Sequence, residues 1–199
     1  MKLDIPAGNF AGYIFDLDGT LVDSMPLHYK AWNEAMHHAG LKEELSEDLF
    51  YSLGGVPTRK VAELLGQHYG LAVDAEKMFH EKEAIFLTLQ SELKVIAPVV
   101  EFARQVAKHF PVSVASGGPK LIVVPTLAKA GLTELFPVVI TPEDVQHGKP
   151  SPDMFLLAAK RMGVSAAECL VFEDAEPGIQ AAEAAGMKWV RVPSRPEQD

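Results

Sequence analysis

The alternation of apolar and helical segments predicts a sheet whose strands are separated by helices. Short apolar runs predict strands at 13–15, 112–115, 138–141, 170–172 and 189–192. From residue 98 onward they alternate with helical spacing at 98–109, 119–130, 152–162 and 177–185. This order is typical of a parallel sheet with helices on both faces. We therefore expect an α/β fold, a Rossmann-like doubly wound parallel sheet.

Residues 25–93 interrupt this alternation. Their apolar spacing predicts only helices, at 26–40, 47–53, 58–70 and 74–93, with a breaker cluster, Gly54-Gly55-Val56-Pro57, between the second and third. A helical block inside an alternating chain is what an inserted domain looks like. We expect a core formed by residues 1–24 and 94–199, with a small helical cap domain at 25–93.

Composition narrows the class of protein and the compartment. The chain has 199 residues, 48% of them hydrophobic, which is enough for a substantial core. Its net charge of −9 disfavours nucleic acid and anionic membranes as partners, so we expect neither. The single cysteine, Cys169, excludes an intrachain disulfide, and the first residues lack the apolar core of a signal peptide. We expect a cytoplasmic protein that is a monomer.

The first candidate for chemistry is the acidic loop after the first strand. Asp16 and Asp18 are two residues apart, so an extended backbone would send both side chains the same way. Two neighbouring carboxylates repel and need a cation, a shared proton or different roles. Gly19 would allow a tight turn that presents backbone N–H groups to an oxyanion. Taken alone, an Asp-x-Asp pair is equally consistent with solvated loop acids.

Polar residues also follow the second and third core strands. Ser116-Gly117-Gly118 can offer a hydroxyl and unhindered N–H groups to a phosphoryl oxygen, although a plain strand-to-helix turn has the same composition. Lys149 lies in a loop stiffened by Pro150 and Pro152, where its ammonium could neutralise a phosphoryl group. The alternative is an exposed surface lysine.

Two acids follow the fourth core strand. Glu173 and Asp174 come directly after a buried run, which should carry them to the sheet edge that holds Asp16. Carboxylate and carbonyl oxygens are the ligands that Mg²⁺ prefers. The sequence therefore predicts a Mg²⁺ site at this edge.

These motifs resemble those of the haloacid dehalogenase-like hydrolase superfamily. The matching residues are Asp16-Leu17-Asp18-Gly19-Thr20, Ser116, Lys149 and Glu173-Asp174. The helical insertion after the first motif resembles the small cap of the β-phosphoglucomutase-like subfamily. Ala175-Glu176 after the acid pair is more similar to the phosphatases of that subfamily acting on fructose 1-phosphate and 6-phosphogluconate than to the mutase.

The resemblance implies roles for the core residues. Asp16 would be the nucleophile that forms an aspartyl-phosphate, and Asp18 would be the general acid and then the base. The metal ligands would be Asp16, the backbone carbonyl of Asp18, and Glu173 or Asp174 or both, with Asp174 favoured as a direct ligand. Ser116, Gly117 and Lys149 would hold the transferring oxygens, with Gly118 beside them.

The resemblance also implies substrate-binding residues in the cap. His28 matches a histidine of the mutase-like group that could contact Asp18 or the substrate. The Gly54 to Arg59 segment corresponds to the substrate loop, which makes Gly55 and Arg59 candidates, with Lys60 competing for the role of Arg59.

Three functions are compared on these residues. A mutase carries polar and basic groups after its second-motif serine to hold a second phosphate, whereas this chain has Gly118-Pro119 there. We therefore expect a Mg²⁺-dependent phosphomonoesterase acting on a small phosphorylated sugar or sugar acid, with a phosphosugar mutase as the alternative. A phosphoaspartate signalling receiver is disfavoured because such domains lack a long helical insertion.

Overall fold

The computed structural model describes residues 1 and 3–193, so residues 194–199 of the expected core lie outside the described residues. The chain divides into two compact units. We call Met1–Asp23 with Lys94–Asp199 the core unit, and Ser24–Leu93 the helical unit. That the helical unit acts as a cap over a substrate stays a prediction.

The core unit contains a five-stranded sheet in the order β3-β2-β1-β4-β5. The strands are β1 (Gly12–Phe15), β2 (Val112–Ala115), β3 (Val138–Ile140), β4 (Cys169–Glu173) and β5 (Lys188–Arg191). Every paired neighbour is parallel, and β1 lies between β2 and β4. The predicted α/β fold with an all-parallel sheet is confirmed.

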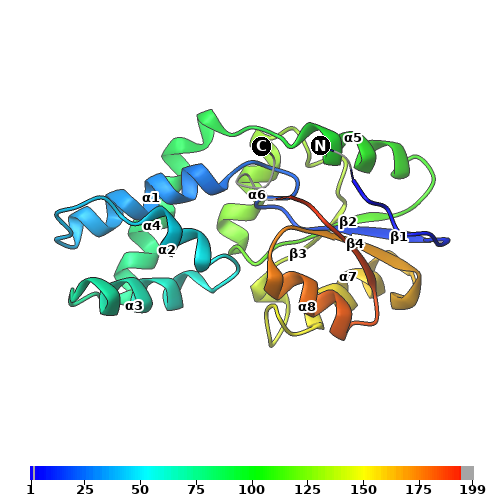
Figure 1. The fold of residues 1–199 in the computed structure, drawn as a ribbon. Coiled ribbons are helices and arrows are strands. Elements are labelled where there is room, and N and C mark those ends of the chain that lie inside the picture. The colour runs from blue at the N-terminus through cyan, green and yellow to red at the C-terminus, as the bar shows by residue number, and fades with distance from the viewer. Residues whose placement is uncertain (2, 194–199) are drawn as a thin grey trace. The chain divides into compact units, whose positions relative to one another are not determined.

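Helices cover both faces of this sheet. They are α5 (Ala97–Val106), α6 (Lys120–Lys129), α7 (Asp153–Met162) and α8 (Glu176–Ala184), with short 3₁₀ turns η2 (Pro142–Asp144) and η3 (Ala166–Glu168). Figure 1 shows α5 on the face opposite α7 and α8. Side chains alternate between the faces: Ile14 and Val171 pack with α7 and α8, whereas Phe15 stacks on Phe172 at 4.7 Å between ring centroids on the other face.

Several element boundaries differ by a few residues from the sequence predictions, and two of them lie in the core unit at α5 and β4. The helix predicted at 98–109 ends at Val106, because residues 107–110 form turns instead. The strand predicted at 170–172 extends to Glu173, whose N–H and carbonyl continue the ladder beside Arg191. Glu173 is therefore held rigidly by the sheet, and Asp174 is the first residue beyond it.

The helical unit contains no strand among its residues. Its elements are α1 (Met25–His38), α2 (Glu47–Ser52), α3 (Thr58–Tyr69), α4 (Ala75–Leu89) and η1 (Gln90–Glu92). The α-helix predicted at 74–93 therefore ends at Leu89, and the next three residues form the 3₁₀ turn η1. Asp74 starts α4 by accepting two backbone N–H bonds at 3.0 Å. The helical unit has an apolar core of its own, which includes Trp32, Met36, Phe50 and Leu65.

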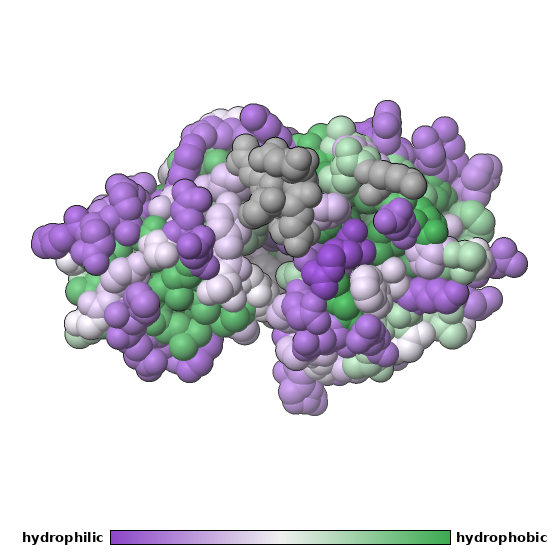
Figure 2. Space-filling model, in the orientation of Figure 1, coloured by the Kyte–Doolittle hydropathy of each residue, from purple (hydrophilic) through white to green (hydrophobic). Residues whose placement is uncertain are grey.

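The described helices are all too short or too polar to cross a bilayer. Figure 2 shows hydrophilic side chains interrupting the apolar patches on the face in view.

Candidate active site

The acidic loop begins where β1 ends. Asp16 follows Phe15 and donates its backbone N–H to the carbonyl of Phe172 at 2.9 Å, which ties it to β4. The loop then closes tightly, because the N–H groups of Leu21 and Val22 both bond to the carbonyl of Leu17, at 2.9 and 3.0 Å. Asp16 is 6% exposed. Its position is therefore fixed by the two central strands.

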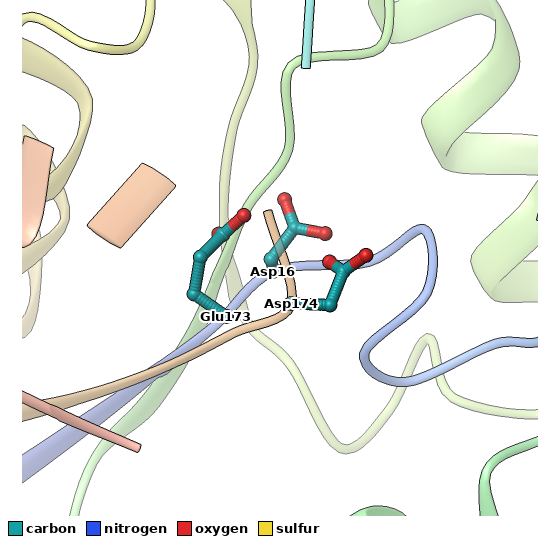
Figure 3. A group of neighbouring side chains, drawn as sticks. All are labelled: Asp16, Glu173 and Asp174. Carbon is teal, nitrogen blue, oxygen red and sulfur yellow. The ribbon is translucent and has the colours of Figure 1, made fainter. Parts of the chain in front are cut away.

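Three carboxylates converge at the ends of β1 and β4. One carboxyl oxygen each from Asp16, Glu173 and Asp174 lies within 4.8 Å of the others. Figure 3 shows the three carboxyl groups pointing to the same side of the backbone. The sequence prediction that these acids meet at one sheet edge agrees with this geometry.

Lys149 is the ammonium that the structure places among these acids. Its Nζ donates to Asp16 Oδ1 at 2.6 Å and to Glu173 Oε2 at 2.8 Å, and its side chain is 8% exposed. It is therefore not a surface lysine. Burial alone would lower the pKa of Lys149, but the Asp16 and Glu173 charges outweigh burial and raise it, so the ammonium form persists.

The carboxyl groups carry more negative charge than one lysine balances. Burial raises the pKa of Asp16, although the Lys149 ammonium opposes the rise. Burial and the Asp16 charge raise the pKa of Glu173 well above 4.5 and that of Asp174 to about 7. A divalent cation would offset this repulsion, and three clustered carboxylates are the hard oxygen donors that such a cation requires. The donor set therefore fits a metal ion.

Glu173 and Asp174 have different surroundings although they are adjacent. Glu173 faces Lys149 and packs so closely against the backbone of Gly178 that a Cβ there would overlap its carboxyl carbon. Asp174 instead accepts a hydrogen bond from Thr20 Oγ1 at 3.2 Å. Glu173 thus orients the lysine, whereas Asp174 lies against the loop that carries Asp16.

The second predicted motif lies at the end of β2, beside β1 in the sheet. Ser116 is buried, and its Oγ accepts the N–H of Gly118 at 3.1 Å. A Cβ added to Gly118 would lie 3.3 Å from Ser116 Oγ and 3.7 Å from Asp18 Oδ2. The missing side chain at Gly118 therefore leaves space between the serine and the second aspartate, while nothing lies within 4 Å of the Cβ position at Gly117.

Three of the four candidates in the helical unit contact side chains of that unit. His28 stacks on Phe86 with centroids 4.0 Å apart. Arg59 pairs with Glu76, at 2.9 Å for its NH2 group, and lies over the Phe79 ring. Lys60 pairs with Glu63 at 2.8 Å, and Gly55 turns the chain with a φ of +77°. Their role in substrate binding stays a prediction.

Sequence reasoning missed Arg191, which lies at the end of β5. It donates to the carbonyl of Asp174 at 3.3 Å and to Glu176 Oε2 at 2.7 Å, so it ties the acid loop to the start of α8. The parallel register of β4 and β5 pairs Arg191 with Glu173, and this pairing is visible only in the structure.

Comparison with known proteins assigns the family. Residues 10–186 match the profile of the haloacid dehalogenase-like hydrolases. The chain belongs to this family. The prediction made from the motifs is thereby confirmed.

Relatives of this hydrolase include several phosphatases. It is 39% identical over 184 residues to fructose-1-phosphate phosphatase YqaB of Escherichia coli (strain K12), which covers 92% of this chain and 96% of that one. It is 29% identical to a phosphorylated carbohydrates phosphatase of Thermotoga maritima, over 89% of this chain and 82% of the relative.

Solved structures agree with the fold. A HAD hydrolase of family IA, variant 3, from Entamoeba histolytica superimposes with a TM-score of 0.79 at 31% identity, over 89% of this chain and 82% of that one. A provisionally named β-phosphoglucomutase from Thermotoga maritima gives a TM-score of 0.70 at 29% identity, over 88% and 82% of the two chains.

Proposed function

We propose that this hydrolase is a Mg²⁺-dependent phosphomonoesterase that removes phosphate from small sugar phosphates, with Asp16 as the nucleophile. The observation that carries the proposal is the contact of Lys149 Nζ with Asp16 and Glu173 in a buried site that also contains Asp174. The relatives named as sugar-phosphate phosphatases support the substrate class.

Each core side chain has a task in this reaction. Asp16 is buried and fixed by the sheet, so its carboxylate can attack phosphorus in line and form an aspartyl-phosphate. Lys149 and the Ser116 hydroxyl neutralise and hold the transferring oxygens. Asp18, whose Oδ2 lies near the space at Gly118, donates a proton to the leaving oxygen and then accepts one from the attacking water.

The residues that would hold Mg²⁺ are Asp16, Asp174 and the backbone carbonyl of Asp18, with Glu173 beside them. The bound ion supplies positive charge that offsets the repulsion between a phosphate dianion and the Asp16 carboxylate. Thr20 orients Asp174 from the loop, and Arg191 holds its backbone carbonyl. These two contacts position the acid beside Asp16.

The experiment that tests the proposal compares phosphate release from p-nitrophenyl phosphate with and without Mg²⁺. We expect Asp16→Asn to abolish release, while the exposed Asp4→Asn control retains it. Rapid acid quenching followed by peptide mass analysis should find the phosphoryl group on the peptide that contains Asp16. Turnover by Asp16→Asn at the wild-type rate would overturn the proposal.

A phosphosugar mutase is the second candidate, favoured by the similarity to the provisionally named β-phosphoglucomutase. A mutase must hold a bisphosphate intermediate, and Gly118-Pro119 offers no cationic side chain after Ser116. Hydrolysis of a panel of hexose and pentose phosphates, assayed beside interconversion of glucose 1- and 6-phosphates, separates the two. We expect release of inorganic phosphate without interconversion.

A further inference from the structure

The loop that carries Lys149 has an exposed backbone, although the lysine side chain is buried. Gly148 and Pro150, on either side of the lysine, are exposed. The Lys149 side chain is only 8% exposed and ends between Asp16 and Glu173. An exposed loop gains little from apolar packing, so its conformation depends on the hydrogen bonds that it makes. The position of the ammonium therefore depends on whatever fixes this loop.

Asp153, the first residue of α7, binds the loop on both sides of Lys149. Its Oδ1 accepts a hydrogen bond from Ser151 Oγ at 2.8 Å, and its Oδ2 lies 3.2 Å from His147 Nδ1. These two bonds lower the pKa of Asp153, so the carboxylate is ionised near neutral pH and both partners donate to it. The Ser151 N–H also donates to the carbonyl of Gly148 at 2.9 Å. One carboxylate thus joins the residues before and after the lysine to the start of a helix.

The two bonds to Asp153 differ in their surroundings. The His147 side chain is 71% exposed, so water competes for its bond, and exposed ion pairs contribute little to stability. Ser151 is half-buried, and the Asp153 side chain is 34% exposed. We therefore expect the serine hydroxyl to account for most of the restraint on the loop.

The same helix also contacts the lysine side chain. Phe155, two residues after Asp153 on α7, is fully buried, and Lys149 Nζ lies over its ring at 5.0 Å from the centroid. An ammonium within about 6 Å of an aromatic ring is attracted to the face of that ring. The start of α7 therefore holds the loop through Asp153 and adjoins the ammonium through Phe155.

An acid in the first turn of a helix has a simpler explanation, which is attraction to the positive end of the helix dipole. That explanation requires a negative charge but no particular hydrogen bonds. The two bonds of Asp153 described above run to the loop, which requires acceptor oxygens at defined positions. The two explanations therefore predict different results when the charge is removed and the oxygen is kept.

We propose that Asp153 is a positioning residue, which holds the Lys149 loop so that the ammonium stays at Asp16 and on the transferring phosphoryl oxygens. This inference rests on the proposed function, in which Lys149 neutralises those oxygens. Asp153 acts through Lys149 alone.

The first test compares kcat and KM for p-nitrophenyl phosphate in wild type, Asp153→Ala and Asp153→Asn. Asp153→Ala removes both acceptors, so kcat should fall about 10- to 100-fold while KM changes little, because the displaced ammonium is needed most in the transition state. Asp153→Asn keeps an oxygen that can accept from Ser151 and should retain most of the activity, although it lacks the charge. Ser151→Ala should lose more activity than His147→Ala.

Asp74→Ala is the matched control, because Asp74 also lies at the start of a helix and accepts hydrogen bonds there. It should lower stability and leave kcat at the wild-type value. If Asp153→Ala gives the same result, Asp153 only stabilises α7, and the inference fails while the proposed function stands. Equal losses of kcat in Asp153→Asn and Asp153→Ala would also overturn it.

A double-mutant cycle with Lys149→Met tests whether Asp153 acts through the lysine. In the Lys149→Met background, Asp153→Ala should leave the residual kcat unchanged, and a further loss as large as in wild type would overturn the inference.

The same cycle measured by denaturant unfolding does not depend on turnover. Lys149→Met should cost less stability when Asp153→Ala is already present, because the contacts of the lysine are then weaker. Additive losses of stability would contradict the positioning role. If wild type releases no phosphate, the proposed function fails, and the unfolding cycle still decides whether Asp153 positions Lys149.

Discussion

Gly19 and Asp174 are in such close contact that a Cβ on the glycine would overlap the carboxylate of the aspartate. The two residues are far apart in the sequence and come from different strand ends, β1 and β4. Gly19 also has a φ of +84°, a conformation that L side chains rarely adopt. The glycine therefore meets a local backbone requirement and a tertiary one at the same position.

Gly19→Ala should cost activity far more than stability. The added methyl group would push Asp174 away from Asp16, and a displacement of this size at a reacting centre lowers kcat/KM by about 100-fold. Gly131→Ala is the control, since Gly131 has a similar φ of +68° but open space at its Cβ position. It should lose stability by about 1 kcal/mol and keep its activity. Equal losses of p-nitrophenyl phosphatase activity in both variants would contradict the proposed collision.

Much of this arrangement follows from sequence because it depends on strand order. In a parallel sheet the carboxyl ends of the strands meet at one edge, so acids that follow two buried apolar runs come together. The proximity of Asp16 to Glu173 and Asp174 is a consequence of this rule. The same rule places the Ser116 loop beside β1.

The contacts of individual side chains could not be predicted from the sequence. Glu173 and Asp174 look equivalent in the sequence, yet the strand continues through Glu173, so the two acids contact different residues, Lys149 and Thr20. Lys82 and Glu83 are buried beside His28 and Thr58, and the periodicity of the sequence does not indicate these contacts. Such contacts are set by packing between elements and leave no periodic signal.

Thr20 should affect the affinity for Mg²⁺ through its hydrogen bond to Asp174. Its hydroxyl bond lowers the pKa of Asp174 against the rise caused by burial, so Thr20→Val should raise that pKa further. A smaller fraction of Asp174 is then deprotonated near neutral pH. The Mg²⁺ concentration for half-maximal activity should therefore increase. Thr20→Ser keeps the hydroxyl and should stay near wild type. The measurement is activity against Mg²⁺ concentration at several pH values, and an unchanged Mg²⁺ dependence in Thr20→Val would count against the role of the hydroxyl.

Stabilisation by Mg²⁺ should grow as pH rises. The pKa of Asp174 is raised from 3.8 to about 7, so between these values the metal-free folded protein binds more protons than the unfolded chain, and this group's contribution to stability falls with increasing pH. A cation competes with those protons and removes the penalty. The increase in Tm on adding Mg²⁺ should therefore be larger at pH 8 than at pH 5.5.

Asp174→Asn provides the comparison for this pH effect. It removes the titrating group, so the Mg²⁺-dependent rise in Tm should be small at both pH values. A wild-type rise that is the same at pH 5.5 and pH 8 would mean that protons on Asp174 do not compete with the metal.

Removing the Lys149 charge should affect stability and catalysis together. Lys149→Met leaves Asp16 and Glu173 buried without their shared ammonium, and breaking such a pair costs about 3–5 kcal/mol in the free energy of unfolding. The loss should be smaller near pH 5, because burial raises the pKa of both carboxyls and protonation then relieves the unpaired charge. In catalysis the missing cation should lower kcat by about 10³.

Denaturant unfolding at pH 5 and pH 7.5 measures the loss of stability in Lys149→Met. Lys129→Met, at an exposed position, is the control. Equal destabilisation at both pH values would show that the lysine contributes packing and not charge balance.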